Sequence, residues 1–324
     1  MKVEQSSGCS LSALCLLSGY SRQAYYKRHL QAENKPLKEE LIIQQVLDCR
    51  RMQPRIGGRK LFLLITPFMK QRAIAMGRDA FFALLGKYGL LNKRRRVKPR
   101  TTNSDHRMKK YPNLVKEMTP TGSDQLWVSD ITYLELSNRD AFLSLVTDAY
   151  SRKIIGFHVS SSLGAAGTLQ ALQMAIGERE QIPGLIHHSD RGTQYCCHRY
   201  VTELTGRKIN ISMTQGADPR DNAIAERVNG ILKMELLQPV FADVQAAAAA
   251  VTQAVNIYNY MRPHSSLSML APALVHGRNL NVRRCWKNYY RTRKEGIADG
   301  VIHKKEVTFK KKKEAKKKNV PQYG

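Results

Sequence analysis

The sequence predicts an α/β fold, in which a mixed-sheet core follows an all-α region and precedes a basic C-terminal extension. Three observations support this class. Residues 11–91 show only helical patterns, punctuated by glycine and proline. Between residues 125 and 214, short apolar runs rich in β-branched residues alternate with helical patterns, as in sheets covered by helices. Residues 276–324 are irregular, basic and predicted to be partly disordered.

Two helical units are predicted at the start of the chain. Residues 1–36 have a helix-turn-helix pattern: an apolar helix from Leu11, a break at Gly19, and Ser21 as the cap of a second helix. Residues 37–95 form a second helical, DNA-binding-like unit. We expect DNA contacts from basic residues of the first unit, namely Arg22, Lys27 and Arg28. An ordinary helical hairpin without DNA contact is the alternative.

A basic stretch, KRRRVKPR over residues 93–100, opens a linker that we place at residues 96–120. It has no strong periodicity, so no helix or strand is predicted there. Its candidate DNA contacts are Arg94, Arg95 and Arg96. The alternative is a linker that stays solvated.

Residues 121–275 predict the mixed-sheet core. Strands near 125–136, 140–149 and 153–162 are expected to form an antiparallel meander. The next elements are a helix near 165–180, a strand ending at Asp190, a helix near 195–205 and a strand over 209–214. The last are a helix over 218–237, with Asp218 or Asp221 as N-cap, and a helix over 243–260 that Pro263 stops.

Charge is unevenly distributed along the chain. The sequence has 53 basic and 26 acidic residues, a formal net charge of +27. Residues 1–120 hold 25 basic and 8 acidic residues, residues 121–275 hold 12 and 14, and residues 276–324 hold 16 and 4. Clustered lysine and arginine release counterions when they bind phosphates, so the two flanks predict a polyanionic partner, double-stranded DNA.

Three acids in the core predict a catalytic site. Asp130 lies inside an apolar strand, where an unpaired carboxylate is costly, and Asp190 lies at the carboxyl end of another strand. Glu226 shares the polar face of a predicted helix with Asn222, Asn229 and Lys233. Carboxylate oxygens are the ligands that Mg²⁺ prefers, and two such ions can assist in-line phosphoryl transfer. We therefore predict a two-metal site for Mg²⁺, with Mn²⁺ as an alternative ion.

Each candidate has a plainer interpretation. Asp190, followed by Arg-Gly, can be only a turn former, and Lys233 can be a solvated helix lysine rather than a phosphate contact. Asp148 is a fourth acid, for which we favour a role in a hairpin turn. A structural role is favoured over catalysis for four residues near the end of the core, namely Tyr258, Asn259, Arg262 and His264.

Two further interpretations, a zinc site and a membrane-spanning segment, fit the sequence poorly. His187, His188, Cys196 and Cys197 are adjacent pairs, whereas zinc-binding cysteines are usually separated by two to four residues and neighbouring strand side chains point to opposite faces. The apolar run over residues 11–17 is too short to span a bilayer. No membrane association is expected, and the cysteine usage suits a reducing cytoplasm.

Several spaced motifs together resemble the downstream reading frame of the IS3 family of insertion-sequence transposases. In the core they are WVSDITY (127–133), DAYSRKIIG (148–156), HSDRGTQY (188–195), DNAIAE (221–226), KME (233–235) and YNYMRPH (258–264). Upstream, residues 77–79, 89–91 and 101–106 are similar to that family's amino-terminal region. The resemblance covers nearly the whole chain.

The resemblance implies a ribonuclease-H-like core and DNA-strand cleavage and transfer at the ends of an insertion sequence. It implies that Asp130, Asp190 and Glu226 are the catalytic acids and metal ligands, and that Lys233 contacts end DNA. It also implies a homo-oligomer on DNA and an upstream-frame product, fused by frameshifting or acting in trans, in the bacterial cytoplasm on the nucleoid. The rival functions are a catalytically silent DNA-binding regulator and a plain nuclease of the same fold.

Overall fold

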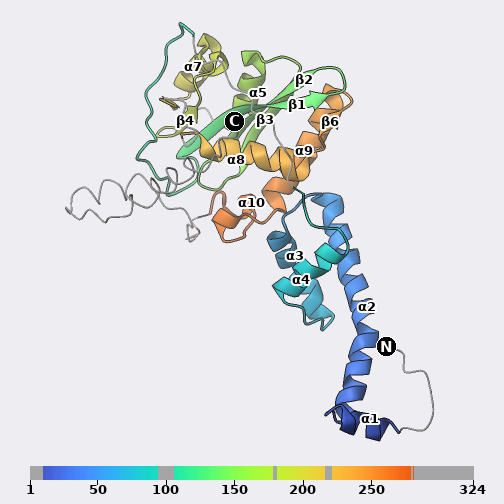
Figure 1. Cartoon of the computed structure of the whole chain (residues 1–324). Helices are drawn as coiled ribbons and strands as arrows, with labels where there is room; N and C mark the ends of the chain where they lie inside the picture. Colours follow the sequence, from blue (N-terminus) through green and yellow to red (C-terminus); the bar gives the residue numbers. More distant parts are fainter. Residues whose placement is uncertain (1–9, 94–105, 178–180, 216–220, 279, 281–324) are drawn as a thin grey trace, which may run out of the picture.

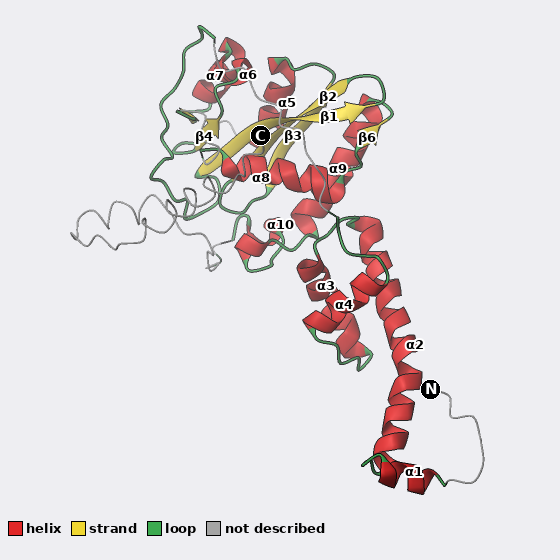
Figure 2. Ribbon diagram, in the orientation of Figure 1, coloured by secondary structure: helices red, strands yellow, loops and turns green. Residues whose placement is uncertain are grey.

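A computed structural model describes residues 10–93, 106–177, 181–215, 221–278 and 280 (Figure 1). An arm of helices projects from a sheet that is covered by helices on both faces (Figure 2). The predicted α/β class, with an all-α region before a mixed-sheet core, is confirmed. The predicted basic extension over residues 276–324 lies mostly outside the described residues.

The arm consists of α1 (Leu11–Leu17), α2 (Arg22–Met52), α3 (Gly58–Gln71) and α4 (Arg78–Lys87). Ser21 caps α2, as predicted, because its hydroxyl accepts from the Ala24 amide. α2 continues through Pro36, so the units predicted at residues 1–36 and 37–95 share one helix. Their division into two units stays a prediction. A separate apolar core joins α2, α3 and α4, around Ile42, Leu61, Ile65, Phe81 and Leu85.

The sheet contains β1 (Leu126–Leu136), β2 (Asp140–Asp148), β3 (Ile154–Ser160), β4 (Ile186–Ser189), β5 (Asn210–Met213) and the short β6 (Val240–Phe241). Its order is β3-β2-β1-β4-β5, with β6 beside the far end of β1. β1, β2 and β3 form the predicted antiparallel meander, while β4 and β5 run parallel to β1. This mixed sheet between two helical layers is the expected ribonuclease-H-like arrangement.

Helices cover both faces of the sheet (Figure 1). One apolar core joins the sheet to α5 (Ala165–Ile176), α6 (Thr193–Cys196) and α7 (His198–Gly206). A second joins it to α8 (Ala223–Ile231), the π-helical turn η1 (Leu232–Leu236) and α9 (Val244–Tyr260). The 3-10 turn η2 (Ser265–Leu267) and α10 (Pro272–Val275) complete the described core.

The start of α8 differs from the prediction. Its N-cap is Asn222, not Asp218 or Asp221, and the helix begins at Ala223. Asp218 lies outside the described residues, and Asp221 is in the turn before the helix. Asp221 and Asn222 are equally suited to capping, so local propensity could not choose between them. The Asn222 amide makes a tertiary contact instead, donating to the Ser129 carbonyl of β1 at 2.9 Å.

Gly156 allows α5 to lie directly on β3. A Cβ atom at this position would stand 2.0 Å from the Ala171 carbonyl oxygen, which is backbone and cannot move aside. The close approach of strand and helix therefore requires glycine here. α5 in turn covers β3 and β2, next to the strand that carries Asp130.

Candidate active site

Asp130 lies half-buried in the middle of β1, as predicted. One carboxylate oxygen accepts from the Ile131 amide at 2.9 Å, and the other accepts from the Asn229 side-chain amide at 2.8 Å. Burial raises the pKa of Asp130 to about 7, and the negative charge of Asp190 adds to this, while the Asn229 hydrogen bond opposes it. The protein thus holds this carboxylate in place but disfavours its charge.

Asp190 directly follows β4, the strand next to β1. β4 is parallel to β1, and Val128 pairs with His188. The pairing ends there, and two residues further along the two segments reach Asp130 and Asp190, whose charge acts on Asp130. Asp190 Oδ1 also accepts from the Gly192 amide at 3.0 Å, so the residue does form the turn that the plainer interpretation expected.

The polar face of α8 lies against β1. Asn229 contacts Asp130, and one turn later Lys233 Nζ lies 3.4 Å from Thr132 Oγ1. Asp130 and Thr132 are two residues apart in the strand and point to the same side of the sheet. Of the four residues predicted to share a polar face, Asn222, Asn229 and Lys233 contact β1, while Glu226 is exposed. The sequence pattern placed Asn229 on this face but did not predict its hydrogen bond to Asp130.

Glu226 lies on the exposed side of the first turn of α8. Burial raises its pKa, and its charge in turn raises the pKa of Asp130, though less than Asp190 does. In the described ranges, no three His, Cys, Asp or Glu side chains are already arranged to hold one metal ion. Asp190 and Glu226 nevertheless both act on the charge of Asp130, Asp190 more strongly.

His188 fixes the turn that leads into α8, a role that sequence reasoning missed. Its Nε2 lies 3.1 Å from the Asp221 carbonyl, and its Nδ1 lies 2.8 Å from Ser212 Oγ. A carbonyl only accepts, so Nε2 carries the proton and Nδ1 accepts from the serine. Burial lowers the pKa of His188 to about 4, which keeps the ring neutral. β4 and β5 thereby hold the entry to the helix that bears Glu226.

The four residues considered as zinc ligands make separate contacts. His187 Nε2 lies 2.7 Å from Ser129 Oγ and 2.9 Å from Tyr200 Oη, and burial lowers its pKa to about 3. Cys196 Sγ contacts Met213 Sδ, and Cys197 Sγ contacts the Gln194 carbonyl. The adjacent histidines therefore bond to different partners, as expected for neighbouring strand residues.

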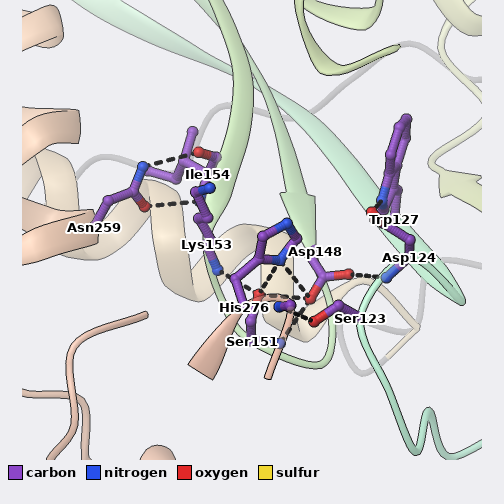
Figure 3. A network of polar contacts seen from close by, with 10 residues as sticks. Ser123, Asp124, Trp127, Asp148, Ser151, Lys153, Ile154, Asn259 and His276 are labelled. Atoms are coloured by element: carbon purple, nitrogen blue, oxygen red, sulfur yellow. Dashed lines mark hydrogen bonds and ion pairs between the residues drawn. The ribbon is translucent and has the colours of Figure 1, made fainter. Parts of the chain in front are cut away.

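Asp148 closes the β2–β3 hairpin, which confirms the favoured structural interpretation (Figure 3). It is fully buried and accepts from the Ser151 amide and hydroxyl, at 2.7 and 2.6 Å, and from the Asp124 amide at 2.8 Å. The Ser151 hydroxyl also lies 3.0 Å from His276 Nδ1. Asp148, Ser151 and His276 thus connect the segment after α10 to the β2–β3 hairpin.

The motif at the end of α9 and just after it is structural, as favoured. The Asn259 side chain pairs with both the amide and the carbonyl of Ile154, at 2.9 Å each, where the β2–β3 register shifts (Figure 3). Arg262 is 1% exposed and makes a bidentate pair with Glu235 of η1, at 2.8 and 3.0 Å. Tyr258 and His264 are buried beside it.

The predicted DNA contacts are only partly described. Arg22, Lys27 and Arg28 are exposed near the start of α2, and the Arg28 guanidinium lies 4.4 Å from the centre of the Tyr20 ring. Arg94, Arg95 and Arg96 lie outside the described residues. No helix in the described part of the chain is long and apolar enough to cross a membrane.

Comparisons with known proteins identify the family. Two integrase core domain models match, over residues 120–219 and 207–272. The uncharacterised 31 kDa protein of insertion element IS600 from Shigella sonnei is 32% identical over 267 residues, which cover 80% of this chain and 96% of that protein. Transposase InsF of insertion sequence IS3A from Escherichia coli K12 is 27% identical, over 84% of this chain and 95% of that protein.

Among solved structures, the catalytic core domain of HTLV-2 integrase in complex with magnesium is similar, with a TM-score of 0.38 and 17% identity. The similarity covers 48% of this chain and 97% of that domain. The family resemblance predicted from the motifs is confirmed by the sequence relatives, which match nearly from end to end. The chain belongs to the IS3 family of insertion-sequence transposases.

Proposed function

We propose that this transposase cleaves DNA strands at the ends of its element and joins them to target DNA through a site formed by Asp130, Asp190 and Glu226. One observation supports the assignment: Asp130 lies in β1, Asp190 directly follows the parallel neighbouring strand β4, and the helix bearing Glu226 is bonded to β1. Two partly buried acids that act on each other are costly without a cation, which suits a site that receives one.

The donor set fits Mg²⁺, with Mn²⁺ as the alternative. Carboxylate oxygens are hard ligands, and a magnesium site needs only a few of them because the ion keeps several waters. Burial and the charge of Asp190 disfavour the ionised form of Asp130, and a bound cation would favour it. The chemistry that the bound ions supply is activation of an attacking oxygen and stabilisation of the leaving one. Asp130 and Asp190 would hold them, and Glu226 would complete the site.

The chain's other residues position the acids and the DNA. Asn229 holds the Asp130 carboxylate at 2.8 Å and fixes its orientation. Lys233, one turn further along with its Nζ 3.4 Å from Thr132 Oγ1, would contact a phosphate of the end DNA. A water or a 3′-hydroxyl would attack the phosphodiester, and the 3′-oxygen of the broken bond would leave with the departing strand. No covalent bond between protein and DNA is formed in this scheme.

We further propose that the active form is a homo-oligomer on DNA in the bacterial cytoplasm. An upstream-frame product, fused or in trans, would supply additional end recognition. Arg22, Lys27 and Arg28 of α2, together with Arg94, Arg95 and Arg96, would contribute largely sequence-independent contacts to DNA phosphates.

The test is a cleavage and joining assay on a supercoiled plasmid that carries the gene's own flanking DNA, with and without Mg²⁺. The intact chain and Glu226→Gln are compared, each alone and with the upstream-frame product. Joined products that disappear in Glu226→Gln support the proposal. Cleavage without joining would instead indicate a nuclease, and DNA binding with neither activity would indicate a silent regulator.

A further inference from the structure

A cluster of basic side chains lies where the helical arm meets the core. Arg55, just after α2, donates its backbone amide to the Glu235 carbonyl of η1 at 3.0 Å. Lys60, in the first turn of α3, places its Nζ 3.7 Å from Glu235 Oε1. Arg262 holds the same carboxylate from the core side. One glutamate therefore joins two cations that belong to different parts of the molecule.

Positive charge exceeds negative charge at this junction. Arg227 of α8 and Arg262 both act on Lys60, and Arg152 joins them in acting on His264 and Tyr258. Among the described residues, Glu235 is the one carboxylate that acts on Lys60 or Tyr258. Lys60 and Arg262 thus share a single carboxylate, with Arg227 adding positive charge beside Lys60, and such an excess in a partly desolvated place is costly unless an anion joins it.

Arg227 is exposed, but solvent reaches the Lys60–Glu235 pair only in part. The Lys60 side chain is 13% exposed and the Glu235 side chain 19%. Burial lowers the pKa of Lys60 to about 8, and the neighbouring arginines contribute, although Glu235 favours the charged amine. Burial likewise lowers the pKa of His264 to about 3, so this histidine adds no further charge at neutral pH.

Two observations point to a ligand at the junction. The Tyr258 hydroxyl is fully buried, and in the described structure it has no hydrogen-bond partner. The N-terminus of α3, next to Lys60, has Gly57 as its cap, with no side-chain cap and no acid in its first turn. An unmatched buried hydroxyl and an open positive helix end both suit an anion with several acceptor oxygens.

We infer that this junction binds a phosphate of the DNA backbone, through Lys60 of the arm and Arg227 of the core. The inference rests on the proposed action on element ends and adds a binding site outside the acidic centre. A phosphate bridging these two residues would fix the arm on the core, next to the helix that carries Glu226. DNA binding and the placement of that helix would then be coupled through a single contact.

The experiment measures binding of the full-length chain to a labelled duplex of the gene's own flanking end, in EDTA. Because no metal is present, failure of the proposed catalysis cannot affect the result. Affinity is measured from about 50 to about 200 mM salt, where each phosphate contact contributes about 0.9 to the slope of log affinity against log salt. Lys60→Met and Arg227→Gln should each lower the slope by about 1.

Two controls keep the test specific. Arg199→Gln removes one exposed charge from α7, on the opposite face of the sheet, and should leave the slope unchanged. Lys60→Arg keeps the charge and should bind as the parent does, which separates charge loss from misfolding. Slopes for Lys60→Met and Arg227→Gln that equal the slope for Arg199→Gln would overturn the inference.

A second arm separates DNA from free phosphate as the source of the anion. Acetylation of Lys60 is followed by mass spectrometry with the duplex, or with inorganic phosphate at matched ionic strength. Protection by the duplex alone supports the inference. Equal protection by inorganic phosphate would show a site for the free ion and would contradict a DNA contact.

Discussion

The side-chain amide of Asn229 on α8 donates to the carboxylate of Asp130 in β1 across 2.8 Å. With the Ile131 amide on the other oxygen, both acceptors of this carboxylate are fixed by the protein. Partners of this kind orient metal-binding carboxylates and set how strongly the metal is held. α8 therefore both carries Glu226 and holds Asp130 in place.

Removing this hydrogen bond should weaken metal use without preventing folding. Asn229→Ala is expected to lower Mg²⁺-dependent strand joining by about 10- to 100-fold and to raise the Mg²⁺ concentration needed for half-maximal activity. A Mg²⁺ titration of the joining reaction measures both quantities. Asn210→Ala, at an exposed position of β5, is the control and should titrate as the parent does. An unchanged Mg²⁺ requirement in Asn229→Ala would contradict the role given to this amide.

The Arg262–Glu235 pair should be important for stability. Glu235→Gln leaves the Arg262 guanidinium buried with a weaker partner, and loss of one member of a buried ion pair costs about 3–5 kcal/mol in the free energy of unfolding. Urea unfolding followed by circular dichroism measures this loss. Glu203→Gln breaks the more exposed pair with Arg207 and should cost less than about 1 kcal/mol. Equal losses in the two variants would show that burial of the pair does not matter.

Gly156→Ala should destabilise the core because its Cβ would collide with the α5 backbone. The expected loss is at least about 1–3 kcal/mol in the free energy of unfolding, the range for overpacked sites. Gly206→Ala, at the end of α7 with open space around its Cβ, should be neutral or slightly stabilising. The melting temperatures of the two variants provide the comparison, and a Gly156→Ala protein as stable as the parent would refute the close packing.

Stability should fall at mildly acidic pH because His264 is buried in its neutral form. Burial lowers its folded pKa to about 3, whereas the unfolded value is about 6.5. Between these values the unfolded chain binds the proton and the folded chain does not. The contribution of neutral His264 to the free energy of unfolding is therefore complete above pH of about 6.5. Below that pH it falls by about 1.4 kcal/mol per pH unit, toward pH of about 3.

Denaturant unfolding at several pH values tests this directly. His264→Gln should show a shallower loss of stability between pH of about 6.5 and 4 than the parent. His198→Gln, at an exposed position of α7, should keep the slope of the parent. Parallel curves for His264→Gln and the parent would mean that this histidine does not carry the effect.

The local sequence patterns predicted the strand, turn and helix that carry the three acids. The apolar run around Asp130, the turn after Asp190 and the helical spacing around Glu226 each gave the correct element. The contacts between these elements depend on the β1–β4 register, which pairs residues 60 positions apart, and on the packing of α8 against β1, where Asn229 and Asp130 are 99 positions apart. Asn229, His188 and Glu235 were therefore not identified by role, and the two-residue β6 was too short to give a pattern.

The most direct test of the account compares amide substitutions of the three acids with a matched surface change. Asp130→Asn, Asp190→Asn, Glu226→Gln and Glu203→Gln are assayed for Mg²⁺-dependent joining and for duplex binding in EDTA. The account predicts that the first three lose joining yet bind DNA as the parent does, while Glu203→Gln retains both activities. Substantial joining by any of the first three variants would contradict the assignment of the acidic site.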